Sequence, residues 1–218
     1  MREVDGIRFY DELDEIVAPT HTALLIVDMQ NDFVSPAGHF ARSGKDVSRI
    51  ARIVPRLKRI VDAARAAGVL VVYTRQTTLP GLTSDSPAWV YFKTRDGKSP
   101  DYTIAGSWGA DFIPELDPPA GTVVIEKHRP SAFLRTELDD TLRSRGIESI
   151  VVAGCITQGC VQATVTDGSY HDYYAIVVED CVESTSGEQH ENALRFLRSR
   201  YDVVSVDRLL AAWPPIAP

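Results

Sequence analysis

Three residues of this chain combine a carboxylate, an ammonium and a thiol: Asp28, Lys127 and Cys160. Each lies at or just beyond the end of a short apolar run that is typical of a buried strand. In an open parallel sheet, ligands bind beyond the carboxyl ends of the strands, so these side chains are expected at one edge. A thiol beside a base and a cation is equipped for nucleophilic attack on a carbonyl group.

Cys160 carries the clearest local signal of the three. It follows the run SIVVAG and the turn CITQG, and it opens a stretch that can form a helix. The start of a helix favours a thiolate, and its N–H groups without helical partners can bind an oxyanion. The alternative is a small buried hydrophobic residue, the usual role of a free cysteine, which we prefer for Cys155 and Cys181.

Asp28 and Lys127 also have structural alternatives. An aspartate at a strand end can form an ion pair or cap a helix, and a lysine there can extend into solvent. As functional groups, Asp28 would be the base for the thiol, and Lys127 would stabilise the thiolate and the oxyanion. The co-occurrence of all three groups favours catalysis more than any one of them does.

Six apolar, β-branched runs predict the strands that position these groups. They span residues 23–29, 69–74, 122–127, 149–154, 175–180 and 202–207. Helical spacing of apolar residues predicts helices at 47–67, 136–145, 160–171 and 188–200. This alternation predicts an α/β fold, a three-layer α/β/α sandwich around a mostly parallel six-stranded sheet.

The chain divides into two parts in this interpretation. Residues 1–20 form an N-terminal arm, and residues 21–218 form a single domain. Within that domain, residues 76–121 are rich in Gly, Pro, Ser and Trp and interrupt the alternation of strands and helices. So long a connection is usually functional, and we expect it to line a pocket.

Composition narrows the possible partners. The formal net charge of −7 disfavours binding to nucleic acid or to anionic membranes. No apolar run approaches the roughly 20 residues that span a bilayer, and the start of the chain lacks the pattern of a secretory signal. We therefore expect a cytoplasmic protein, in which the three cysteines form no disulfide framework.

Three motifs resemble the signatures of isochorismatase-like cysteine hydrolases. They are LLIVDMQNDF (24–33), EKHRPSAF (126–133) and GCITQGCVQATVTD (154–167), and the likeness extends over residues 22–206. The resemblance implies a Rossmann-like topology, with Cys160 as nucleophile, Asp28 as base and Lys127 completing a catalytic triad. It also implies a cis peptide bond at Cys155–Ile156 and an oxyanion hole made by the N–H groups of Ile156 and Cys160.

The family resemblance also implies a reaction. It is the cleavage of a C–N bond in a small amide, ureido or carbamoyl compound through a thioester, with release of ammonia or an amine. The details look closest to N-carbamoylsarcosine, ureidoacrylate, maleamate and biuret-type amidohydrolases. Nicotinamidases of this family carry closely spaced histidines after the second strand, but residues 71–86 contain none. A metal site needs at least three clustered ligands, so we expect no metal and no other cofactor.

Five residues are candidates for substrate contacts: Gln30, Phe33, Arg75, Trp108 and Gln158. Arg75 could pair with a substrate carboxylate, or with an acidic residue at the surface or in a neighbouring subunit. The glutamines could bind a carbamoyl group, and the aromatic residues, with Trp89, could line an apolar wall or an interface. The expected partner is a small molecule, and the arm and the insertion favour a homo-oligomer, a dimer or tetramer.

Other functions find less support in the sequence. A nucleotide-binding fold needs a glycine-rich loop after the first strand, and MQNDFVSPAG has no such pattern. A thiol redox protein typically has a C-x-x-C pair, and Cys155 and Cys160 are spaced differently. The remaining alternative is a catalytically diverged relative, either a vinyl-ether hydrolase or a binding protein. The well-known vinyl-ether hydrolases lack the cysteine, and the intact triad argues against a binding protein.

Overall fold

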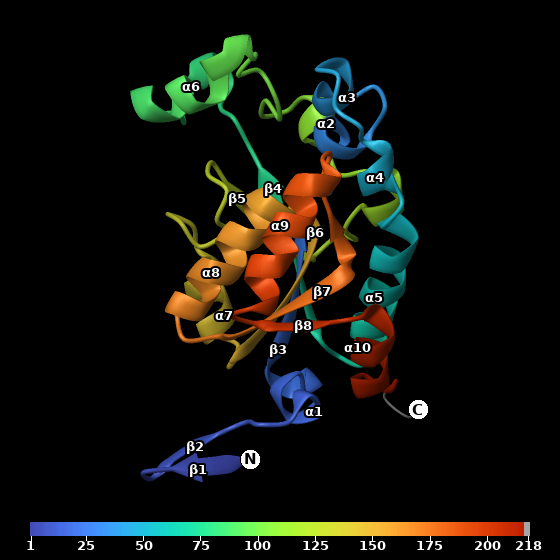
Figure 1. Cartoon of the computed structure of the whole chain (residues 1–218), viewed down its shortest axis with the longest axis vertical. Helices are drawn as coiled ribbons and strands as arrows, with labels where there is room; N and C mark the ends of the chain where they lie inside the picture. Colours follow the sequence, from blue (N-terminus) through green and yellow to red (C-terminus); the bar gives the residue numbers. More distant parts are fainter. Residues whose placement is uncertain (216–218) are drawn as a thin grey trace.

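Six parallel strands form the central sheet of the protein, seen in the computed structural model of Figure 1, which describes residues 1–215. The strands are β3 (Thr22–Val27), β4 (Leu70–Gln76), β5 (Val123–Lys127), β6 (Ser149–Cys155), β7 (Tyr174–Glu183) and β8 (Asp202–Val204). Their order is β5-β4-β3-β6-β7-β8, and every neighbouring pair is parallel. The predicted fold class is confirmed. The last positions of the predicted domain, 216–218, lie outside the described residues.

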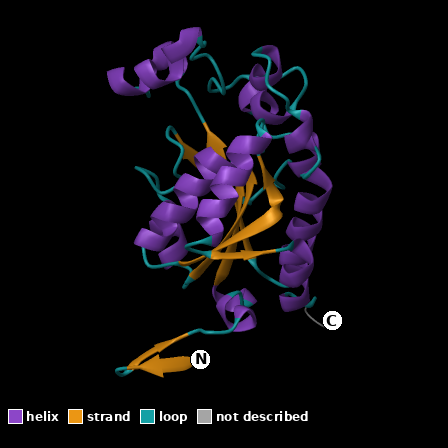
Figure 2. Ribbon diagram, viewed as in Figure 1, coloured by secondary structure: helices purple, strands orange, loops and turns teal. Residues whose placement is uncertain are grey.

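Helices cover both faces of the sheet (Figure 2). On one face lie α4 (Ser48–Ala51), α5 (Val54–Ala66) and α10 (Val206–Ala212), and on the other lie α7 (Leu138–Arg143), α8 (Gln162–Tyr170) and α9 (Gly187–Arg198). Successive residues of β3 point to opposite faces, so Leu24 packs in one apolar core and Leu25 in the other. Because both faces are covered, β3 and β6 are buried at every residue, which explains their continuous apolar runs.

The predicted elements differ from the observed ones mainly at their ends, for example in β8, α5 and α8. The last strand ends at Val204 because Ser205 caps α10, and its side chain accepts a hydrogen bond from the Arg208 N–H. The helix predicted at 47–67 is two helices, α4 and α5, and Pro55 lies in the first turn of the second. The helix predicted from Cys160 starts at Gln162.

Shorter elements complete the chain. Before the sheet come the hairpin β1 (Arg2–Val4) and β2 (Ile7–Phe9), α1 (Leu13–Ile16) and η1 (Pro19–His21). Between β3 and α4 lie α2 (Asn31–Val34) and α3 (His39–Arg42). The segment 76–121 holds η2 (Pro80–Leu82), α6 (Pro87–Thr94), η3 (Arg95–Gly97), η4 (Trp108–Ala110) and η5 (Pro114–Leu116). Within residues 1–215, no helix has the length and apolar character to cross a membrane.

Candidate active site

A buried ion pair lies where β3 and β5 end. Lys127 Nζ is 2.7 Å from Asp28 Oδ2, and neither side chain is exposed to solvent. Strand β4 lies between the two, and Thr74 donates a hydrogen bond of 2.7 Å to Asp28 Oδ1. Lys127 Nζ also donates to the Gln76 Oε1 (3.3 Å) and to the Arg129 carbonyl (3.1 Å). These contacts hold the carboxylate and the ammonium in fixed positions.

Cys160 completes this cluster from the other side of β3. It lies in η6 (Thr157–Val161), a π-type turn that follows β6 and is interrupted by the non-helical backbone of Gly159. Its thiol interacts with both the Asp28 carboxylate and the Lys127 ammonium. The structure therefore brings together the carboxylate, the ammonium and the thiol, which lie far apart in the sequence.

The surroundings of the Cys160 thiol disfavour the thiolate form. Burial raises the pKa of Cys160 to about 12, because Asp28 adds to the effect of burial and Lys127 only partly opposes it. Burial also disfavours the charged form of Lys127, but its pKa is nevertheless raised because Asp28 and Cys160 stabilise the ammonium. At neutral pH the resting cluster thus contains a thiol and an ammonium.

The backbone before Cys160 has the predicted unusual geometry. The Cys155–Ile156 peptide bond is cis. Cys155 is buried, and its Sγ lies 3.3 Å from the Asp28 carbonyl oxygen. Ile156 and Cys160 both line the cavity described next, and the Gly159 N–H donates to the Ile156 carbonyl (3.0 Å). The turn from Ile156 to Cys160 therefore borders the space in front of the thiol.

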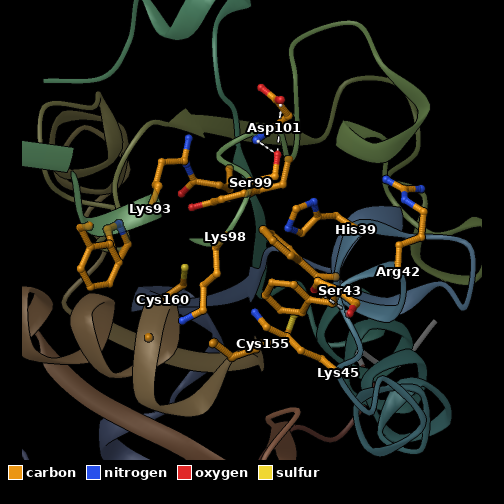
Figure 3. Close-up of a pocket in the computed structure, with 18 of the residues that line it drawn as sticks. His39, Arg42, Ser43, Lys45, Lys93, Lys98, Ser99, Asp101, Cys155 and Cys160 are labelled. Atoms are coloured by element: carbon orange, nitrogen blue, oxygen red, sulfur yellow. Dashed lines mark hydrogen bonds between the residues drawn. The ribbon is translucent and has the colours of Figure 1, made fainter. Parts of the chain in front are cut away.

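A cavity of about 770 Å³ opens above Cys160 (Figure 3). Its wall comes from four parts of the chain: the α2–α3 region, the segment 76–121, Pro130 after β5, and the turn at 155–160. Aromatic side chains form much of the wall, namely those of Phe33, Phe40, Trp89, Phe92 and Tyr102. A volume of this size suits a small organic ligand.

Comparison with known proteins identifies the family. A sequence model described as the isochorismatase domain matches residues 22–207. The chain belongs to the isochorismatase family. It is 35% identical to a ureidoacrylate amidohydrolase RutB of Yersinia enterocolitica over 192 aligned residues. The alignment covers 83% of this chain and 83% of that one.

Solved structures of the family share the fold of this chain. An isochorismatase-like hydrolase from Alkaliphilus metalliredigens has a TM-score of 0.74 at 28% identity, with 89% of this chain and 97% of that one covered. The N-carbamoylsarcosine amidase from Thermoplasma acidophilum has a TM-score of 0.69 at 28% identity, with 86% and 97% covered. The prediction of a hydrolase acting on carbon–nitrogen bonds other than peptide bonds is confirmed by these amidohydrolase relatives.

Of the five predicted contact residues of this isochorismatase-family chain, Phe33 lines the cavity. Arg75 does not, because strand alternation turns it away from Thr74 and Gln76. Its guanidinium packs over the Phe112 ring at 4.8 Å and lies 3.5 Å from Glu126 Oε1. The role proposed for Arg75 in binding a carboxylate therefore has no geometric basis.

Trp108 and Gln158 are not cavity residues either. The Trp108 side chain is 51% exposed on η4, away from the wall. Gln158 donates a hydrogen bond of 2.8 Å to Gln189 Oε1, so it connects the η6 turn to α9.

Gln30 joins two segments instead of contacting the cavity. Its amide is fully buried, donates to the carbonyls of Gln76 (2.9 Å) and Ala110 (2.8 Å), and accepts from the Gln76 N–H. Its two neighbours act likewise: Asn31 donates to the Trp108 carbonyl, and Asp32 Oδ2 accepts from the Thr103 N–H. Residues 30–32 thus hold the segment 76–121 through its main chain.

Sequence reasoning missed several polar residues of the cavity. They include His39, Lys45, Lys93, Lys98 and Tyr102. His39 lies on the short helix α3 and Lys93 on α6, whereas the other three lie in irregular connections. No local pattern indicates that any of them faces the thiol. Among the residues that the structure describes, no three or more His, Cys, Asp or Glu side chains form a group that could hold a metal ion.

Proposed function

We propose that this chain is a metal-independent cysteine amidohydrolase of small ureido or carbamoyl compounds, with Asp28, Lys127 and Cys160 as its catalytic triad. The observation that carries the proposal is the buried Asp28–Lys127 ion pair, whose two charges interact with the Cys160 thiol at the cavity. The names of the relatives, ureidoacrylate amidohydrolase and N-carbamoylsarcosine amidase, support this substrate class.

The first half-reaction begins from the protonated thiol. Cys160 Sγ attacks the substrate carbonyl while its proton passes to Asp28, so a thiolate is needed only during attack. The N–H groups of Ile156 and Cys160 bind the oxyanion, and each such donor typically contributes about 3 kcal/mol. Protonated Asp28 then gives its proton to the departing nitrogen, which leaves as ammonia or an amine. A thioester on Cys160 remains.

The second half-reaction reverses these roles. Asp28 takes a proton from a water molecule, whose oxygen attacks the thioester carbonyl. The tetrahedral intermediate collapses with release of the Cys160 sulfur, which regains the proton from Asp28. Lys127 stays an ammonium throughout, forms the ion pair with the Asp28 carboxylate and stabilises the thiolate as it forms.

The test is release of ammonia from a panel of carbamoyl amino acids, ureido acids, biuret and simple amides. Cys160→Ala should abolish turnover of every accepted compound without unfolding the protein. Cys181→Ala is the matched control, because Cys181 is buried in the core and does not line the cavity. Acid quenching followed by mass spectrometry should show an acyl group on Cys160. Normal turnover by Cys160→Ala would overturn the proposal.

A further inference from the structure

One helix holds the turn that carries the proposed oxyanion hole. The turn is η6, and α9 packs directly against it. Inside the turn the backbone is irregular: Gly159 is non-helical, and the Ile156 carbonyl accepts from the N–H groups of both Gly159 and Val161. Catalytic groups act well only when supporting hydrogen bonds hold them within about 0.5 Å of the productive geometry. The contacts made by α9 are therefore candidates for such support.

Two side chains at the start of α9 bind the turn. His190 Nδ1 and Thr157 Oγ1 share a hydrogen bond of 2.8 Å. Gln158 Nε2 donates to Gln189 Oε1, also over 2.8 Å. Two consecutive residues of η6 are thus connected to two consecutive residues of α9, close to the N–H groups of the proposed oxyanion hole.

The contact between Thr157 and His190 is the buried one of the two. Thr157 is fully buried and His190 is 7% exposed, whereas the contact between the two glutamines is exposed to solvent. Neither partner of a buried hydrogen bond can exchange it for water, so its loss leaves a polar group unsatisfied. His190 is therefore the stronger of the two anchors.

The imidazole ring of His190 is itself supported. Glu183 Oε1 lies 3.4 Å from His190 Nδ1. The Glu183 carboxylate accepts hydrogen bonds from Arg49 Nη2 on α4 (3.2 and 3.3 Å) and from the Ser184 N–H (2.9 Å). Glu183 ends β7 and is the register partner of Cys155, the residue that precedes the turn. A continuous chain of contacts thus connects α4, the end of β7, the imidazole ring and the turn.

We propose that His190 is a positioning residue for the oxyanion hole. Through Thr157, it holds the N–H groups of Ile156 and Cys160 where the substrate carbonyl oxygen becomes an anion. This role rests on the proposed function, which places the oxyanion at these two groups. His190 does not line the cavity, so it acts on the reaction only through the turn. It should therefore affect the chemical step and leave the binding of the substrate ground state almost unchanged.

The first test is steady-state kinetics on the ureido or carbamoyl compound that the unchanged chain hydrolyses fastest. Thr157→Val and His190→Leu each remove the hydrogen bond. Both should lower kcat about tenfold or more and leave KM within about twofold. Thr157→Ser keeps the hydroxyl group, and His190→Asn places a polar amide near the position of Nδ1. Both conservative variants should recover most of kcat.

Thr22→Val is the matched control for Thr157→Val. Thr22 is equally buried, and its hydroxyl donates a hydrogen bond of the same length, 2.8 Å, to the Ala18 carbonyl. It begins β3, so it lies at the end of the strand opposite to the site. Both threonine variants lose a buried hydrogen bond, but Thr22→Val should leave kcat within about twofold because the turn is untouched.

The second test needs no turnover and uses isobutyraldehyde as the probe. The Cys160 sulfur bonds reversibly to the aldehyde carbon, and the thiol proton passes to the carbonyl oxygen, which lies in the oxyanion hole. Protection of Cys160 against iodoacetamide measures the affinity, whereas alkylation itself displaces iodide and forms no oxyanion. Thr157→Val and His190→Leu should weaken aldehyde binding about tenfold and change the alkylation rate by less than about twofold.

The outcomes separate the positioning role from the proposed function. Unchanged kcat and aldehyde affinity in both variants would overturn the role of His190, even in a chain that hydrolyses ureido compounds. Equal losses in Thr22→Val, or no protection by the aldehyde in the unchanged chain, would overturn it as well. Weaker aldehyde binding in both variants of a chain that hydrolyses no ureido or carbamoyl compound would overturn the proposed function and leave the positioning role standing.

Discussion

At the scale of single residues, the site depends on two opposite charges that are both removed from water. Asp28 follows β3 with a positive φ of 52°, a conformation that few residues other than glycine adopt. This backbone and the hydrogen bond from Thr74 hold the carboxylate against Lys127. A buried charge without its partner is strongly destabilising, so the members of the pair are interdependent.

Asp28→Asn removes the proposed base and leaves Lys127 and Cys160 unchanged. Loss of general acid–base catalysis should lower kcat by a factor of about 10²–10⁴. The Asp28 carboxylate helps to raise the pKa of Cys160, so its removal lowers that pKa and the thiolate forms at lower pH. The pH profile of Cys160 alkylation should therefore move to lower pH while turnover falls. Unchanged turnover, or a profile that does not move, would contradict this role.

Lys127→Met leaves the buried Asp28 carboxylate without its counter-charge. Breaking a buried pair in this way costs about 3–5 kcal/mol, and we expect a loss of that size in the free energy of unfolding. Urea denaturation measures it. The double variant Asp28→Asn, Lys127→Met should recover much of the loss, because no charge is left unpaired. Additive losses from the two single changes would argue against the interdependence.

At the scale of elements, the sequence predicts the sheet well and the connections poorly. The strands of a parallel sheet are buried on both faces, so runs such as 149–154 reveal them directly. Lys45 and Lys98 lie in connections whose course is set by long-range contacts, such as those made by Asp32 with the N–H groups of His39 and Thr103. No local pattern encodes such contacts. The alternation along β4, in contrast, indicates that the Arg75 side chain points away from Thr74 and hence from the site.

The close approach of β3 and β6 depends on Gly154. Its φ is +121°, and a Cβ there would lie 2.2 Å from the Val27 carbonyl oxygen, next to Asp28. Gly154→Ala should lower the free energy of unfolding by about 3 kcal/mol or more and reduce activity, because Val27 must move. Gly121→Ala is the control, with a φ of +84° and nothing within 4 Å of the added carbon. Equal losses of stability in the two variants would show that backbone strain alone matters.

At the scale of the whole molecule, the hairpin β1–β2 extends away from the sheet (Figure 1). It exposes 52% of Val4 and 70% of Ile7. A two-stranded hairpin is marginally stable alone in water, so an arm of this kind gains stability from a second surface. The homo-oligomer predicted from the sequence would offer such a surface on another copy of the chain.

Light scattering over a range of concentrations measures the assembly. The intact chain should have the mass of a dimer or tetramer, and removal of residues 1–9 should shift it towards the monomer at lower concentrations. Ile7→Asp should act in the same direction because it places a charge on the apolar face, whereas Arg8→Gln serves as the matched control on the same strand. A monomeric intact chain would refute the prediction.

Residues 30–32 hold the segment 76–121 almost entirely by its main chain, through the carbonyls of Trp108 and Ala110 and the N–H of Thr103. Such main-chain contacts do not depend on most side chains of the segment 76–121. Gly109 is an exception, because a Cβ there would meet the Asp32 carboxylate. Mutations can therefore accumulate along this wall without loosening its attachment. Descendants of one ancestral enzyme could in this way acquire new substrates while the hydrolytic chemistry beneath stayed unaltered.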